Sequence, residues 1–268
     1  MIDKRLRTRR QATFVLASGL LLFVAVLGVN LAKAERSQEG NLTVSINGGL
    51  SPLHLPRNHR APVALRIGGR ISTTDGAPLP RLTHIRLALG GRGVLYTHGL
   101  PTCSRAQIRN ATTRQALNRC GAAIVGRGSI DAEVFVPKQA PFPTRGRLLA
   151  FNGRTADGGR AVWVHAYAAS PPVSVVLPFL IRRNANTLQT SLSAAVPASL
   201  GGIVHLSAFS LLLSRRFTYD DQHHSYLSAT CPAPQGFTAG FLTFARATYD
   251  FAGGRRLRVE AVRSCHAR

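Results

Sequence analysis

Acidic residues are scarce in this chain of 268 residues, where 11 Asp and Glu stand against 34 Lys and Arg and the net charge is +23. No two carboxylates lie within the aromatic, sugar-stacking surroundings that a glycosidase needs, so that class of enzyme is disfavoured. Lysine is almost missing as well, since only Lys4, Lys33 and Lys138 occur and arginine carries the rest of the positive charge. GC-rich coding alone would produce such a ratio.

Motifs with a defined mechanism are also missing. The chain has no G-x-S-x-G, H-E-x-x-H, P-loop, EF-hand or S-x-x-K pattern. No two cysteines are two to four residues apart and none has a histidine at zinc-finger spacing, which argues against a zinc site. We therefore expect a protein that is not an enzyme and that needs no cofactor. A secreted hydrolase whose site is dispersed along the sequence is the alternative.

Long apolar runs are limited to one, at residues 12–32, and five basic residues between positions 4 and 10 precede it. Ala32-Lys33-Ala34 then supplies a small-x-small cleavage pattern, so residues 1–34 are predicted to be a signal peptide. The run approaches the roughly 20 residues that span a bilayer, and a retained single-pass membrane anchor is the alternative. Both predict that the chain after residue 34 lies outside the cytoplasm, secreted or tethered in the cell envelope.

The exported part, residues 35–268, keeps a charge of +18 from 28 basic and 10 acidic residues. Such a charge can attract an anionic envelope polymer or nucleic acid. The arginines are scattered, however, and no basic run alternates with aromatics of the kind that stack bases. We therefore favour an evenly charged surface and do not expect nucleic acid as a partner. An anionic envelope polymer and a protein partner stay open.

All four cysteines lie in the exported part, and their even number predicts two disulfides. Four cysteines allow three pairings. A chain that folds in consecutive segments favours the local ones, which are Cys103 with Cys120 and Cys231 with Cys265.

The distribution of apolar, polar, Gly and Pro residues along the chain indicates the fold class. Residues 35–61 mix polar residues with Gly and Pro and are predicted to be a flexible linker. From residue 62 onward, short apolar alternations are broken by Gly and Pro; in one of them Ile85, Leu87 and Leu89 face opposite to Arg86. This spacing predicts a single all-β domain over residues 62–268, an antiparallel sandwich or, as the alternative, a barrel.

One helical insertion is predicted between Cys103 and Cys120. Ser104 followed by Gln107 matches a capping box at the start of a helix. Thr112 and Thr113 interrupt the pattern, so two short helical turns and one helix are both compatible with it.

One polar cluster, Asp220, Asp221, His223 and His224, could contribute ligands to a metal site. Neighbouring residues on a strand face opposite ways, so such a site would need a partner from another loop. We favour the interpretation that the cluster is the polar tip of a hairpin and expect neither a metal nor a catalytic residue there.

A second candidate is the stripe of Trp163, His165 and Tyr167, which share one face of a predicted strand and could form a binding surface. An inner wall of the sandwich is the favoured interpretation, because a sole tryptophan usually anchors a core. His205, predicted on the same strand face as Phe209 and Leu211, is interpreted as a core histidine.

Residues 100–130, with "GRLLAFNG" and "SYLSATCPAPQGFTAGFLTFARATYDF", resemble a group of exported, cysteine-bearing, β-rich proteins of high-GC Gram-positive bacteria. The resemblance covers most of residues 60–268. It implies an exported β-domain and no activity, cofactor or site residue. Our functional expectation is a non-enzymatic extracellular or envelope domain that binds a partner, with an electrostatic binder of anionic polymer as a further alternative.

Overall fold

The computed structural model describes residues 35–90, 93–183, 190–198 and 202–268, so the predicted signal or anchor, residues 1–34, lies outside the described part. Strands dominate these residues, and the helices are α2 (Arg105–Ile108), α3 (Thr113–Cys120) and a 3-10 turn (Gly121–Ala123). The all-β prediction with a short helical insertion is confirmed. None of the helices in the described ranges is long and apolar enough to cross a membrane.

Most strands belong to one large sheet, in the order β1-β2-β5-β13-β8-β9-β10-β11-β12-β6-β17-β18-β3. Neighbours are antiparallel except for the short pair β18 and β3. The strands of this sheet are β1 (Glu35–Glu39), β2 (Leu42–Ser51), β3 (His54–Leu55), β5 (Ala64–Thr73), β6 (Leu82–Leu89), β8 (Ile124–Val134), β9 (Phe142–Arg154), β10 (Arg160–Ala169), β11 (Pro172–Arg183), β12 (Thr190–Ala195), β13 (Val204–Leu213), β17 (Ala239–Phe251) and β18 (Arg256–Ala267).

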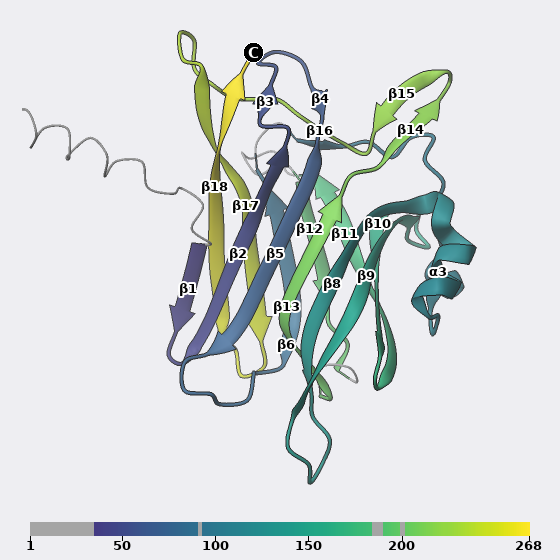
Figure 1. Cartoon of the computed structure of the whole chain (residues 1–268), viewed down its shortest axis with the longest axis vertical. Coiled ribbons are helices and arrows are strands. Elements are labelled where there is room, and N and C mark those ends of the chain that lie inside the picture. Colours follow the sequence, from purple (N-terminus) through teal and green to yellow (C-terminus); the bar gives the residue numbers. More distant parts are fainter. Residues whose placement is uncertain (1–34, 91–92, 184–189, 199–201) are drawn as a thin grey trace, which may run out of the picture. The chain divides into compact units, whose positions relative to one another are not determined.

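Two small sheets account for the remaining strands of the described residues. One is the hairpin of β14 (Arg216–Tyr219) and β15 (Gln222–Ser225), and the other joins β4 (Ala61–Pro62), β16 (Leu227–Ala229) and β7 (Val94–Leu95). Both lie at the same end of the large sheet in Figure 1.

The large sheet curls until its two ends approach each other. Glu35 of β1 accepts a hydrogen bond through its carboxylate from the backbone N–H of Val262 in β18, at 2.6 Å. Arg263 of β18 donates through Nε to the carbonyl of Gly48 in β2, also at 2.6 Å. Figure 1 shows β18 beside β1 and β2. One continuous curled sheet therefore takes the place of the two stacked sheets that the favoured sandwich requires, because the accumulated twist of many strands brings the edges together.

The region predicted to be a linker, residues 35–61, is part of this sheet. Leu42, Val44 and Ile46 alternate on β2 and have no exposed surface. They belong to the main apolar core, together with side chains of β5, β17 and β18. Gly48 and Gly49 lie within β2 itself, and Gly40, Pro52 and Pro56 lie in the connections beside β2 and β3, so the prediction of a flexible linker is wrong.

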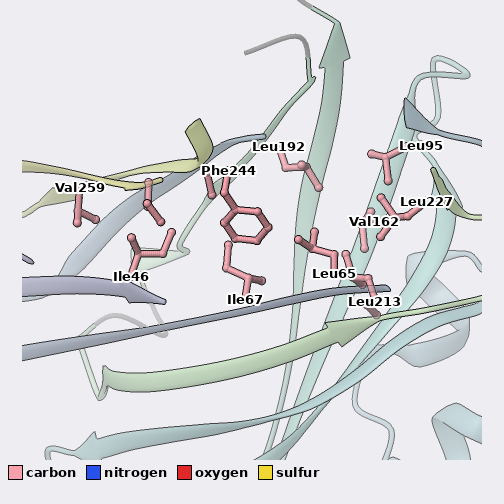
Figure 2. Close-up of a cluster of buried hydrophobic side chains, with 14 of the residues drawn as sticks. Ile46, Leu65, Ile67, Leu95, Val162, Leu192, Leu213, Leu227, Phe244 and Val259 are labelled. Carbon is pink, nitrogen blue, oxygen red and sulfur yellow. The ribbon is translucent and has the colours of Figure 1, made fainter. Parts of the chain in front are cut away.

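The main core fills the inside of the curl. In Figure 2, Phe244 of β17 points toward Ile67 of β5, and Leu65 of β5 gathers with Val162 of β10 and Leu213 of β13. Side chains that alternate inward along each strand are apolar, which is the period-2 pattern of a sheet with one buried face.

A bulge in β13 changes which residues face inward. The pairing of β13 with β8 shifts between Leu206 and Ala208. Leu206 and Phe209 therefore both face the interior although three positions separate them. His205 faces the other side, where its ring centroid lies 4.2 Å from that of Phe135 and its Nδ1 contacts the carbonyl of Leu79. The prediction that His205 shares a face with Phe209 is wrong because of this extra residue.

The helical insertion packs on the outer face of the sheet. Ser104 and Gln107 form the predicted capping box, and Thr112 and Gln115 form a second one at the start of α3. The helices cover a second apolar cluster over β9 to β11 that includes Phe151. The chain thus forms two short helices, as the interrupting threonines allowed.

Both predicted disulfides are confirmed, Cys103–Cys120 and Cys231–Cys265. The first clamps the helical insertion. The second joins the segment after β16 to β18. No described cysteine is free.

Candidate binding cavity

A cavity of about 180 Å³ lies inside the curled sheet. Its walls come from β5 to β13 and β17, so strands from most of the chain contribute to it. Apart from Thr144 and Tyr249, every lining residue is apolar or glycine. A concave, mostly apolar space with very few polar groups is the usual form of a small-molecule site.

Small side chains leave this space open. Ala132 on β8 and Ala166 and Ala168 on β10 line the cavity at positions where a larger residue would fill the gap. The neighbouring strand β13 carries half-buried side chains, such as Leu206 and Leu211, which pack against the core without closing the space; Leu206 pairs with Ala132. The small inward-facing residues of neighbouring strands therefore create the cavity.

Tyr249 is the more deeply buried of the two polar residues that line the cavity. Its side chain has no exposed surface, and its hydroxyl has no hydrogen-bond partner in the described chain. The hydroxyl reaches from β17 across to Gly69 of β5, where an added Cβ would lie 2.9 Å from the Tyr249 Oη. Burial raises the pKa of Tyr249 far above its ordinary value, so the phenol stays protonated and remains a donor.

The polar cluster predicted around residue 220 forms the tip of the β14–β15 hairpin. Asp220 and Asp221 are its two turn residues, with φ of 48° and 56°, the left-handed pair that a tight type I′ hairpin turn requires. Both are exposed, as is His223, whose Nδ1 lies 3.3 Å from the Thr218 hydroxyl. Among the described residues no group of three His, Cys, Asp or Glu converges that could hold a metal ion.

His224 turns to the other face of this hairpin and joins an aromatic cluster that the sequence did not reveal. Its ring stacks on Tyr96 at 4.7 Å between centroids, and Phe217 and Tyr219 lie on the same side. His98 meets Tyr219 edge-on at 4.9 Å. Period-2 alternation along residues 217–224 could have indicated the shared face, but the partners Tyr96 and His98 come from a segment 120 residues earlier.

The stripe predicted as a second candidate is covered by the helical insertion. Trp163 is 6% exposed, and its indole N–H donates to the carbonyl of Cys103 at 2.8 Å. His165 is fully buried and its Nε2 donates to the carbonyl of Ala111 at 2.9 Å, while Tyr167 is half-buried. The first two side chains bind the insertion to the outer face of the sheet.

Comparisons with protein-family models, with curated proteins and with solved structures find no match to this chain. The resemblance to exported proteins of high-GC Gram-positive bacteria therefore stays a prediction. The cavity is the feature from which we infer a function.

Proposed function

We propose that this protein is an exported, non-enzymatic binding domain that holds a small apolar molecule inside its curled sheet. The observation that carries the proposal is the cavity of about 180 Å³ with almost entirely apolar walls. Dry apolar cavities of about 150 Å³ take up benzene-sized molecules, so the space suits one ring or a short branched chain.

The ligand of this proposal has a single hydrogen-bond acceptor. Leaving the Tyr249 hydroxyl unpaired inside an apolar wall costs about 1–3 kcal/mol. A carbonyl or ether oxygen beside the Tyr249 Oη would remove that cost, and the neutral phenol can donate to it. An apolar body with one acceptor fits these walls better than a charged molecule, because no described charged side chain lines the cavity.

The two disulfides support the expected location, since disulfides persist in oxidising compartments outside the cytoplasm. The hydrolase alternative has less support. Hydrolysis needs a nucleophile or activated water with a base and an oxyanion site, and the cavity offers one hydroxyl from Thr144 and one from Tyr249 among apolar walls.

The test uses acetophenone and ethylbenzene, which share a ring of suitable size and differ in the carbonyl. Binding to the full chain is measured by calorimetry and by ligand-observed NMR. Ala166→Phe places a ring in the cavity and should abolish binding of both molecules. Ala169→Phe is the control, because Ala169 lies three residues along the same strand and is exposed.

Saturable binding by the native chain and by the Ala169→Phe variant, lost in the Ala166→Phe variant, supports the proposal. Equal binding by the two variants would place the ligand outside the curled sheet. Absence of binding by the native chain to either molecule would reject a site of this size and polarity.

A further inference from the structure

A groove of about 670 Å³ lies on the outer face of the curled sheet, between α3 and the strands β5, β13, β8 and β9. Four arginines line it, one from α3 and three from strands: Arg114, Arg66, Arg127 and Arg147. All four are exposed. No acidic residue of the described ranges lines the groove.

The strand register gathers three of these arginines on one patch. Leu212 of β13 pairs with Arg66 of β5 on one side and with Arg127 of β8 on the other. On β9, Leu149 pairs with Arg127 and Arg147 pairs with Ser129, so Arg147 is the diagonal neighbour of Arg127. Diagonal neighbours on antiparallel strands have Cα atoms about 7–8 Å apart, which puts both guanidinium groups within reach of one extended ligand.

The groove arginines lack acidic partners. In the part of the chain that the structure describes, the acids in ion pairs are Asp131, Asp250 and Glu260, and none of them pairs with a groove arginine. Asp131 lies on the same outer face of the sheet, but Arg145 already holds it at 2.7 Å. Four positive charges without an ion-pair partner in one hollow create a local field that attracts anions.

We propose that this groove binds an extended anionic polymer that carries phosphate or carboxylate groups. The planar guanidinium fork matches both oxyanions in a two-point hydrogen bond, which a lysine surface would not do. Leu117 and Leu212, both half-buried, supply aliphatic contact for the polymer backbone between the charges.

Nucleic acid fits the groove less well than such a polymer. Proteins that bind single strands stack bases on aromatic side chains. The lining of the groove contains leucines, small polar residues, glycine and arginines, and no aromatic residue. The inference is independent of the proposed apolar ligand, because the groove opens on the opposite face of the sheet from the cavity.

The experiment compares two triple variants of the full chain with the same change of net charge. Arg66→Gln, Arg127→Gln and Arg147→Gln together form the groove variant. The control combines Arg36→Gln, Arg86→Gln and Arg182→Gln, which change exposed arginines on β1, β6 and β11 that form no ion pair with a described acid. The probes are inorganic polyphosphate, polyglutamate and single-stranded DNA of matched charge, titrated at several salt concentrations.

The groove variant should lose at least tenfold in affinity for polyphosphate or polyglutamate, while the control changes less than threefold. The salt dependence should also weaken in the groove variant, by about two in the slope of log K against log salt if three contacts are lost. A variant with lysine at the three groove positions keeps the charge and should bind with intermediate affinity.

Equal losses in the groove and control variants would overturn the proposal in favour of attraction by net charge alone. Absence of polyanion binding by the native chain would overturn it as well. Tighter binding to single-stranded DNA than to polyphosphate would reject a polymer without bases. Matching circular dichroism and melting curves show whether each variant is folded.

Discussion

Replacing Tyr249 with phenylalanine tests two effects of the unpaired hydroxyl. The hydroxyl should destabilise the ligand-free protein, and it should increase the affinity for a ligand that has a hydrogen-bond acceptor. The side chain has no exposed surface and its hydroxyl has no protein partner. An unsatisfied buried hydroxyl costs about 1–3 kcal/mol, so Tyr249→Phe should stabilise the ligand-free protein by about 1 kcal/mol. For a folded unit of this size, such a gain raises the melting temperature by about 2–4 °C.

Ligand binding should change in the opposite direction. Acetophenone loses one hydrogen bond, whose net worth is about 0.5–1.5 kcal/mol, and should bind roughly 2- to 10-fold more weakly. Ethylbenzene has no acceptor and should bind as before or more tightly. Tyr167→Phe is the matched control, because Tyr167 is a half-buried tyrosine on the outer face of β10 and should alter neither ligand.

Calorimetry gives the affinities of each variant for acetophenone and for ethylbenzene. Thermal unfolding gives the melting temperatures of the ligand-free variants. A Tyr249→Phe variant that melts several degrees lower would refute the premise that the hydroxyl is unpaired. Equal weakening of acetophenone and ethylbenzene would show that the ring position, and not the hydroxyl, had changed.

Three further predictions concern the scaffold. Removing Cys231–Cys265 should lower the free energy of unfolding by about 4 kcal/mol, and removing Cys103–Cys120 should lower it by about 3 kcal/mol. The longer loop loses more because the sequence separations are 34 and 17 residues. Denaturant unfolding of the two Cys→Ala double variants checks this order. Burial lowers the pKa of His165 below its ordinary 6.5, so only the unfolded chain takes up a proton as the pH falls below about 6.5. The free energy of unfolding should therefore fall between that pH and the lowered pKa. His165→Gln should flatten the dependence of the unfolding free energy on pH. Gly99→Ala should destabilise the protein by about 1–3 kcal/mol and shift the NMR resonances of the Tyr219 ring. Gly99 has φ 71°, and an added Cβ would lie 2.1 Å from that ring. Gly76→Ala is the control, because Gly76 also has φ 71° but has open space around it.

Local patterns explain which predictions were correct. Capping needs residues three positions apart, and Ser104 with Gln107 therefore indicated the start of α2 directly. The disulfides join neighbouring segments, so the local pairing of Cys103 with Cys120 could be chosen without knowing the fold. The two-residue turn at Asp220 and Asp221 was interpreted as a hairpin tip because that composition favours turns.

Non-local contacts explain the errors. Residues 35–61 have a loop-like composition, yet Val44 and Ile46 are buried because β5 and β18 supply partners far along the chain. One extra residue in β13 reversed the face of His205, and a period-2 pattern cannot locate such a bulge.

The sequence by itself determined the strand-rich composition, the capped helical insertion, the two disulfides and the excess of arginine, since each depends on residue type or on short spacing. Only the tertiary structure decided that one curled sheet encloses an apolar cavity, that Tyr249 lines it, and that arginines of three strands share a groove with α3. These features depend on strand order and register, which set the neighbours of each side chain across the sheet.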